Sequence, residues 1–282
     1  MLIVDSQVHL QSAGKASPYH RQDLFLAPEL LATMDEAGVD RVVIVPPSWD
    51  PNMNGPSLAA ARLHPDRFAV MGRVSVEKPE SRALIATWKR QPGMLGIRQV
   101  LGHRETRNWE KGGAGEWLWP AAERAQLPVM LHTGLYLHLV EGIAQRHPGL
   151  RLIIDHLGAV LTSSGQDGDA FAHLPEVLAL ARFPNVAVKA SGVATYSSEP
   201  YPFSGMHNYL RQVYDVFGPR RMFWGTDLSR LTYWGSDTTP KTCTYRQAIS
   251  MFTEELHWLS DSDKALIMGR ALCEWIGWKL PE

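Results

Sequence analysis

The chain has 282 residues, with 28 lysines and arginines against 29 aspartates and glutamates, so its net charge is −1. That length fits one large domain or two ordinary ones. The near-neutral charge excludes the basic footprint typical of a nucleic-acid-binding protein. A hydrophobic fraction of 45% and a charged fraction of 20% are globular values, which exclude a disordered chain.

The sequence carries no pattern of a membrane or secretory segment. Its longest apolar runs are strand-sized, far short of the roughly 20 residues that span a bilayer. The residues after Met1 lack a basic stretch followed by a long apolar run, so we expect no secretory signal. The two cysteines, Cys243 and Cys273, are too few for a disulfide framework. These features predict a cytoplasmic protein.

Short apolar runs rich in β-branched residues recur along the chain, and most are continuous rather than alternating. Continuous apolar runs are typical of strands buried on both faces of a parallel sheet. We expect eight strands, at residues 2–5, 41–45, 68–74, 95–99, 129–132, 152–156, 186–190 and 222–226.

Helical patterns follow most of these strands. The clearest begins at Pro28, places Leu30, Leu31 and Met34 on one face, and ends before Gly38. We expect helices at residues 28–37, 56–63, 79–90, 117–125, 139–146, 174–182, 207–217, 245–258 and 261–275.

The alternation of strands and helices predicts the fold class. It indicates right-handed βαβ units and a parallel α/β sheet. Eight such units match the (β/α)₈ TIM barrel, which typically takes about 250 residues. A doubly wound open sheet is the main alternative, but no glycine-rich turn follows the first strand. Since no linker or repeat interrupts the pattern, we expect residues 1–282 to form a single domain.

Ionisable side chains gather at the predicted C-terminal ends of the strands. In a barrel those ends meet on one face, where active sites are built. A histidine or aspartate at a single strand end is often structural, because buried polar groups commonly serve only to satisfy backbone hydrogen bonds. Four such ends together indicate a metal or acid–base site, and they carry His9, His132, His156 and Asp227.

These residue types suit metal-assisted or direct activation of water. Imidazole and carboxylate ligands favour zinc, manganese or iron, and three protein ligands leave room for a bound water. A metal lowers the pKa of that water to about 7. A carboxylate can orient the water and accept its proton.

Several short stretches occur in order along nearly the whole chain, at residues 4–9, 96–98, 128–134, 154–158, 185–189, 222–227 and 267–272. Together they resemble the amidohydrolase superfamily, in its amidohydrolase-related branch (amidohydrolase 2). That branch includes sugar-acid lactonases, a pyrone-dicarboxylate lactonase and non-oxidative decarboxylases. The motifs are specific to the superfamily but not to one substrate.

The resemblance implies a role for each matching residue. His9 and His132 would be metal ligands, and His156 a ligand or an acid that polarises the substrate. Asp227 would bind metal and take the proton of water. The family's first strand normally carries His-x-His, whereas this chain has Gln7 in the first position. Two alternatives stay open: one divalent metal, zinc or manganese, held by His9, His132 and Asp227, or a metal-free site in which Asp227 activates water directly.

Other residues at the same face are candidates for binding a substrate. Arg98 could clamp a carboxylate, since guanidinium pairs with carboxylate through two hydrogen bonds, or it could form an internal ion pair with Asp5 or Asp155. Lys189 could bind an oxyanion or be a buried structural lysine. Long loops with aromatic residues are usually functional. The expected substrate-binding residues are Gln7, Arg98, Lys189, Tyr136, Trp49 and Trp234.

The sequence therefore predicts a lactonase-like hydrolase. Water would attack a lactone, ester or amide carbonyl of a small, cyclic carboxylate, with Asp227 as general base and with His156 and His9 stabilising the oxyanion. The alternatives are a metal-dependent non-oxidative decarboxylase of an aromatic or unsaturated acid, and a non-catalytic binding barrel. The expected partner is a small molecule rather than nucleic acid or membrane, and a homodimer is left open.

Overall fold

The computed structural model describes residues 1–17, 20–101, 113, 115–160, 167–231 and 243–281. Its eight strands form one sheet in chain order, and each strand pairs in parallel with the next. The strands are β1 (Val4–Val8), β2 (Arg41–Ile44), β3 (Phe68–Gly72), β4 (Met94–Val100), β5 (Val129–His132), β6 (Leu152–Ile154), β7 (Val186–Ser191) and β8 (Met222–Gly225).

The first and last strands lie side by side, which closes the sheet into a barrel. The backbone N–H of Asp227 donates to the carbonyl of Gln7 (2.9 Å), and that of Thr226 donates to Oδ1 of Asp5 (2.9 Å). Gly225 permits this close approach, because a Cβ there would lie only 2.4 Å from Oγ of Ser6. The predicted TIM barrel is thus confirmed.

Asp5 at this junction provides a test of how burial affects stability. Its carboxylate is fully buried and also accepts hydrogen bonds from Oγ1 of Thr226 (2.5 Å) and the hydroxyl of Tyr245 (2.8 Å). Burial raises the pKa of Asp5 to about 6, although the hydrogen bonds from Thr226, Gln7 and Tyr245 lower it. Between about pH 4 and pH 6 the folded protein therefore holds a proton on Asp5 that the unfolded chain has lost.

We expect the free energy of unfolding of the wild type to fall relative to that of Asp5→Asn as pH rises from 4 to 7. Two pKa units correspond to about 3 kcal/mol, fully lost above about pH 6. Urea unfolding of both proteins across this pH range measures the difference. A difference that stays constant with pH would contradict the prediction.

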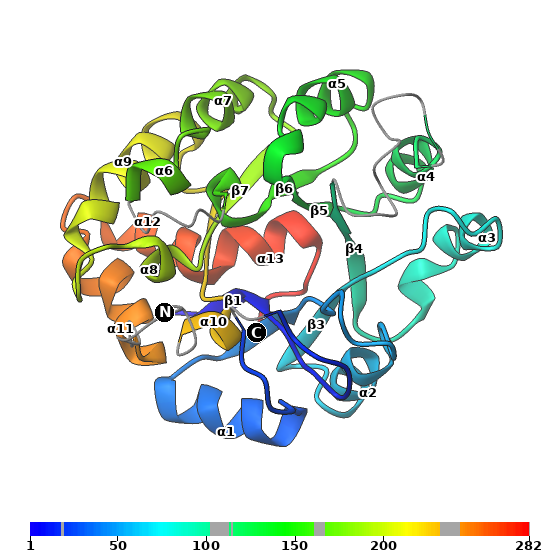
Figure 1. Ribbon diagram of the computed structural model, residues 1–282, viewed down its shortest axis with the longest axis horizontal. Helices are drawn as coiled ribbons and strands as arrows, with labels where there is room; N and C mark the ends of the chain where they lie inside the picture. The colour runs from blue at the N-terminus through cyan, green and yellow to red at the C-terminus, as the bar shows by residue number, and fades with distance from the viewer. Residues whose placement is uncertain (18–19, 102–112, 114, 161–166, 232–242, 282) are drawn as a thin grey trace.

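Helices surround the barrel (Figure 1). The main ones are α1 (Ala27–Ala37), α2 (Gly55–Leu63), α3 (Ser81–Ile85), α4 (Leu118–Arg124), α5 (His138–Arg146), α7 (Leu174–Ala179), α9 (Ser204–Phe217), α11 (Tyr245–Ser250), α12 (Asp261–Ala265) and α13 (Ala271–Ile276). Short 3₁₀ turns η1 (Trp88–Arg90) and η5 (Leu180–Arg182) and π-helical turns η6 (Met251–Glu255) and η7 (Leu266–Arg270) extend some of them. Gly38 ends α1 in the left-handed conformation (φ 80°), as predicted.

Two hydrophobic layers hold the barrel together. One large cluster lies between the strands and the surrounding helices. A second fills the barrel interior, where Val43, Met71 and Phe223 pack with Leu272 and Ile276 of α13. In Figure 1, α13 crosses the middle of the ring of strands. This helix therefore closes one end of the barrel. No helix within the described ranges has both the length and the apolar character needed to cross a bilayer.

The structure corrects some predicted boundaries. The first strand runs from Val4 to Val8 rather than over residues 2–5, because its buried polar residues, Asp5, Ser6 and Gln7, mask the apolar pattern. The sixth strand ends at Ile154, and η4 (Asp155–Gly158) follows with positive φ at His156 and Leu157. Segments expected as loops contain the short helices α6 (Asp167–Ala170), α8 (Val193–Tyr196) and α10 (Leu228–Leu231).

Candidate active site

A cavity of about 200 Å³ lies at the C-terminal ends of the strands. Six residues expected from the sequence line it: His9, Trp49, Arg98, His132, His156 and Asp227. They come from the ends of β1, β4, β5, β6 and β8 and from the loop after β2. The barrel therefore brings side chains that are far apart in the sequence to one cavity, as sites in this fold are usually built.

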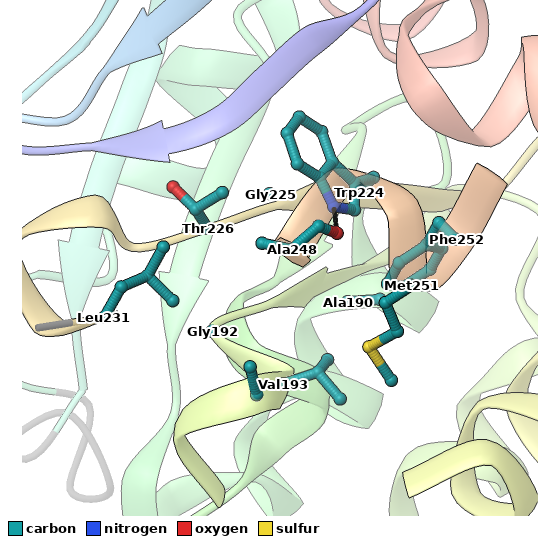
Figure 2. Close-up of a pocket in the computed structure, with 11 residues that line it drawn as sticks. Ala190, Gly192, Val193, Trp224, Gly225, Thr226, Leu231, Ala248, Met251 and Phe252 are labelled. Carbon is teal, nitrogen blue, oxygen red and sulfur yellow. Dashed lines mark hydrogen bonds between the residues drawn. The ribbon is translucent and has the colours of Figure 1, made fainter. Parts of the chain in front are cut away.

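A second, much smaller cavity is lined by residues of β7, β8, α8 and α11 (Figure 2). Its space of about 10 Å³ is close to that of one water molecule. The side chains around it are almost all apolar, and the indole N–H of Trp224 is already bonded to the carbonyl of Ala248 (3.1 Å). It offers no ionisable group, so the chemistry belongs to the larger cavity.

Asp227 follows β8 and is almost completely buried. Its φ of 54° is in the left-handed region, which aspartate tolerates better than most residues and which is common at functional sites. Oδ2 accepts a hydrogen bond from Nη1 of Arg230 (3.3 Å), and Oδ1 lies 3.3 Å from Nε2 of His9. Burial raises the pKa of Asp227, but His9, His20 and Arg230 lower it well below its usual range. The carboxylate is therefore ionised at neutral pH.

His9 faces this carboxylate through Nε2. Its Nδ1 lies 2.6 Å from the carbonyl of Val45, which can only accept, so Nδ1 carries the hydrogen. Nε2 faces Oδ1 of Asp227 at 3.3 Å; with a hydrogen on Nε2 it donates to that oxygen, and without one both atoms are acceptors. Two acceptors facing each other indicate a position for a cation or a proton.

Gln7 is directed away from the cavity. Its Oε1 accepts a hydrogen bond from Nζ of Lys189, so its amide nitrogen is the atom that faces Nε2 of His9 (3.4 Å). Gln7 is fully buried and does not line the cavity. The amide oxygen is thus unavailable as a metal ligand or as a contact for substrate.

Lys189 and Arg98 both pair with Asp155. Nζ of Lys189 lies 2.8 Å from Oδ1, and Nε of Arg98 donates to Oδ2 (3.4 Å). Burial raises the pKa of Asp155, but the two cations lower it below its usual range. Lys189 lies beneath the cavity as a buried structural lysine, whereas Arg98 both pairs with Asp155 and lines the cavity.

The two remaining histidines are neutral. Burial lowers the pKa of His156 to about 3 and that of His132 to about 4. Nδ1 of His156 contacts the hydroxyl (2.9 Å) and the carbonyl (3.2 Å) of Ser191, and Nε2 lies 3.9 Å from Oδ2 of Asp227. The rings of His132 and His156 meet edge to face at 5.8 Å. His156 therefore faces the space beside the carboxylate.

Sequence reasoning missed two ionisable residues of the cavity, His20 and Arg230. Arg230 lies three residues after Asp227, a spacing that places both on one face of a helical turn, and this could have been noticed. His20 lies in the segment between β1 and α1, where no pattern pointed to it. Of the other expected residues, Tyr136 is not among those that line the cavity, and Trp234 lies outside the described residues.

The donor set fits a divalent cation. Within the described part of the chain, His9, His20 and Asp227 each offer one ligand atom within 4.8 Å of the others, and His132 is not in this group. Two imidazoles and a carboxylate are ligands that zinc accepts in catalytic sites, with positions left for water or substrate.

Part of the sequence is similar to that of a curated lactonase. An L-fucono-1,5-lactonase from Burkholderia ambifaria is 31% identical over 173 residues, which cover 58% of this chain. The matched region spans only 56% of that relative's length.

Solved structures share the fold over the whole length. An amidohydrolase from Burkholderia multivorans with bound zinc has a TM-score of 0.80 at 18% identity, covering 100% of both chains. A structure described as a probable 2-pyrone-4,6-dicarboxylic acid hydrolase, from Acinetobacter baumannii with citric acid bound, has a TM-score of 0.73 at 20% identity. It covers 99% of this chain and 100% of the other.

The protein family follows from a match between the sequence and a family model. The model described as Amidohydrolase matches residues 4–271, which include all eight strands and every described residue of the cavity. The chain therefore belongs to the amidohydrolase family, a family of hydrolases.

Proposed function

We propose that this protein hydrolyses a lactone of a small carboxylate, with Asp227 as the general base. The observation that carries this proposal is the buried, ionised carboxylate of Asp227, which lines a cavity shared with His9 and neutral His156. The similarity to a lactonase supports the choice of a cyclic ester over other carbonyl compounds.

The reaction requires one proton to be accepted and then returned. Asp227 takes a proton from water as the water oxygen attacks the carbonyl carbon of the ring ester. The tetrahedral oxyanion collapses, the ring C–O bond breaks, and Asp227 returns the proton to the departing alkoxide. The product is an open-chain hydroxy acid, which releases one proton as its carboxyl group ionises at neutral pH.

His156 is placed to stabilise the oxyanion. Nδ1 of His156 contacts both the hydroxyl (2.9 Å) and the carbonyl (3.2 Å) of Ser191, and we assign the hydrogen to Nε2, the tautomer in which the shorter contact is a hydrogen bond donated by the hydroxyl. That N–H donates to the developing negative charge. His9 suits a different role from the one predicted, because a neutral His9 that donates to Val45 has no N–H directed at the cavity.

A divalent ion such as zinc or manganese, when bound, would supply a water of lowered pKa and polarise the carbonyl. The residues that would hold it include His9 and Asp227. The proton transfer assigned to Asp227 and the hydrogen bond from His156 need no metal.

Arg98 is assigned to a carboxylate of the substrate. Its Nε is bonded to Asp155, and its other guanidinium nitrogens have no hydrogen-bond partner among the described residues. We expect Arg98→Met to raise KM about tenfold or more for lactones that carry a carboxylate, because a charged hydrogen bond contributes about 1.5–3 kcal/mol. Neutral lactones serve as the matched control, and an equal KM change for both classes would remove Arg98 from this role.

Proton release tests the reaction class. A panel of sugar-acid lactones and carboxylated pyrones is incubated with the enzyme in weak buffer, while pH and carbon dioxide are recorded. We expect one proton released per lactone opened and no carbon dioxide. Carbon dioxide release from an aromatic or unsaturated acid would instead establish the decarboxylase, and binding of a small acid without turnover would establish the non-catalytic barrel.

A further inference from the structure

The segment between β1 and α1 is fastened at both of its ends. Gln11 and Phe25 pair through two backbone hydrogen bonds (2.9 and 3.0 Å), which close the base of the segment. Farther out, the backbone N–H of Arg21 donates to the carbonyl of Ser229 in α10 (2.8 Å). These contacts hold the described residues Ser17 and His20 at the wall of the cavity.

The ring of His20 is fixed in the cavity by three neighbours. Its Nδ1 contacts the hydroxyl of Ser229 (2.8 Å), so Nε2 is the nitrogen left for other contacts. The ring lies 5.5 Å from that of His9, edge to face, and 4.7 Å from that of Trp49. An imidazole held this firmly beside an ionised carboxylate is oriented like a ligand.

We propose that His20 supplies the imidazole that Gln7 does not, so that His9, His20 and Asp227 together bind one zinc-class divalent cation. Gln7 occupies the place of the family's first histidine, but its amide oxygen is bonded to Lys189 and its nitrogen faces His9. His20 approaches the same carboxylate from the connection between β1 and α1 rather than from the strand itself.

Each of the three ligands is oriented by a second residue, as is usual in metal sites. The carbonyl of Val45 accepts from Nδ1 of His9, and the hydroxyl of Ser229 contacts Nδ1 of His20. Arg230 binds Oδ2 of Asp227 and leaves Oδ1 facing His9. These outer contacts point one donor atom of each ligand toward a common centre. The inference goes beyond the proposed hydrolysis, which does not require a metal.

Zinc binding to the metal-free protein tests the assignment. The full chain is dialysed against a chelator, titrated with Zn²⁺ by calorimetry, and passed through a desalting column before elemental analysis. We expect about one zinc per wild-type chain. His20→Ala should weaken zinc binding at least tenfold, and Ser229→Ala should weaken it about tenfold, the range found for outer contacts.

His132→Ala is the matched control, since it removes a cavity histidine outside the group of three. We expect it to retain about one zinc with an affinity close to that of the wild type. Circular dichroism confirms folding, and Ser229→Ala carries the test if His20→Ala does not fold. Wild-type affinity in both His20→Ala and Ser229→Ala overturns the proposal, as does loss of zinc in His132→Ala or absence of zinc binding in the wild type. Since lactone opening is assayed separately, either proposal can fail while the other stands.

Discussion

Replacing Asp227 with asparagine is expected to lower kcat for lactone opening by a factor of about 10³ or more, because general bases contribute 10²–10⁴. The asparagine amide keeps the size of the carboxylate but cannot accept the proton of water. Its oxygen can still accept from Nη1 of Arg230, so the turn after β8 should keep its shape. Steady-state kinetics and the melting temperature together measure the effect.

Asp215→Asn provides the control for this variant. Asp215 lies on the exposed side of α9 and pairs with Arg211 (2.8 Å), far from the lining of the cavity. It should leave kcat unchanged. A kcat for Asp227→Asn within tenfold of the wild type would remove Asp227 as the base.

The second large effect concerns the stability of the fold, which depends on the buried ion pair between Lys189 and Asp155. Lys189→Met should lower the free energy of unfolding by about 3–5 kcal/mol, since among the described cations it leaves the buried charge of Asp155 with the 3.4 Å contact to Arg98 alone. Methionine has a similar length, and the sulfur of Met130 already lies 3.4 Å from Nζ of Lys189. Guanidinium unfolding followed by circular dichroism measures the loss.

A second substitution separates charge from packing. If the loss comes from the uncompensated carboxylate, Lys189→Met combined with Asp155→Asn should recover more than half of it. Lys89→Met is the matched control, because Lys89 is largely exposed and donates only to the carbonyl of Gln126 (2.9 Å). It should cost less than about 1 kcal/mol. A double variant as unstable as the single one would assign the effect to packing instead.

The sequence predicted the barrel because strands that are buried on both faces consist of continuous runs of apolar residues, and such runs are easy to recognise. It predicted less well where polar residues are buried. The first strand was placed too early, since Asp5 and Gln7 gain several partners from β7, from the residue after β8 and from α11, and the local pattern does not show those partners.

The site was predictable as far as it lies at strand ends. His9, His156 and Asp227 follow strands, and the barrel brings them together. His20 was not predictable in this way. Its position depends on the pairing of Gln11 with Phe25 and on the contact with Ser229, and both join residues that are not neighbours in the sequence. Likewise, the ion pair of Lys189 with Asp155 joins β7 to the end of β6 and could not be read from either segment alone.

The junction between β1 and β8 has a consequence for when the protein becomes active during its synthesis. Asp227 is held through Gln7, and its neighbour Thr226 through Asp5, a residue 221 positions away along the chain. Contacts of such long range form late, because much of the chain's entropy must be lost first. On the ribosome, Asp227 therefore cannot take its place in the cavity until β8 has emerged and packed against β1. With Asp227 as the proposed base, a chain with only seven completed strands would not open a lactone.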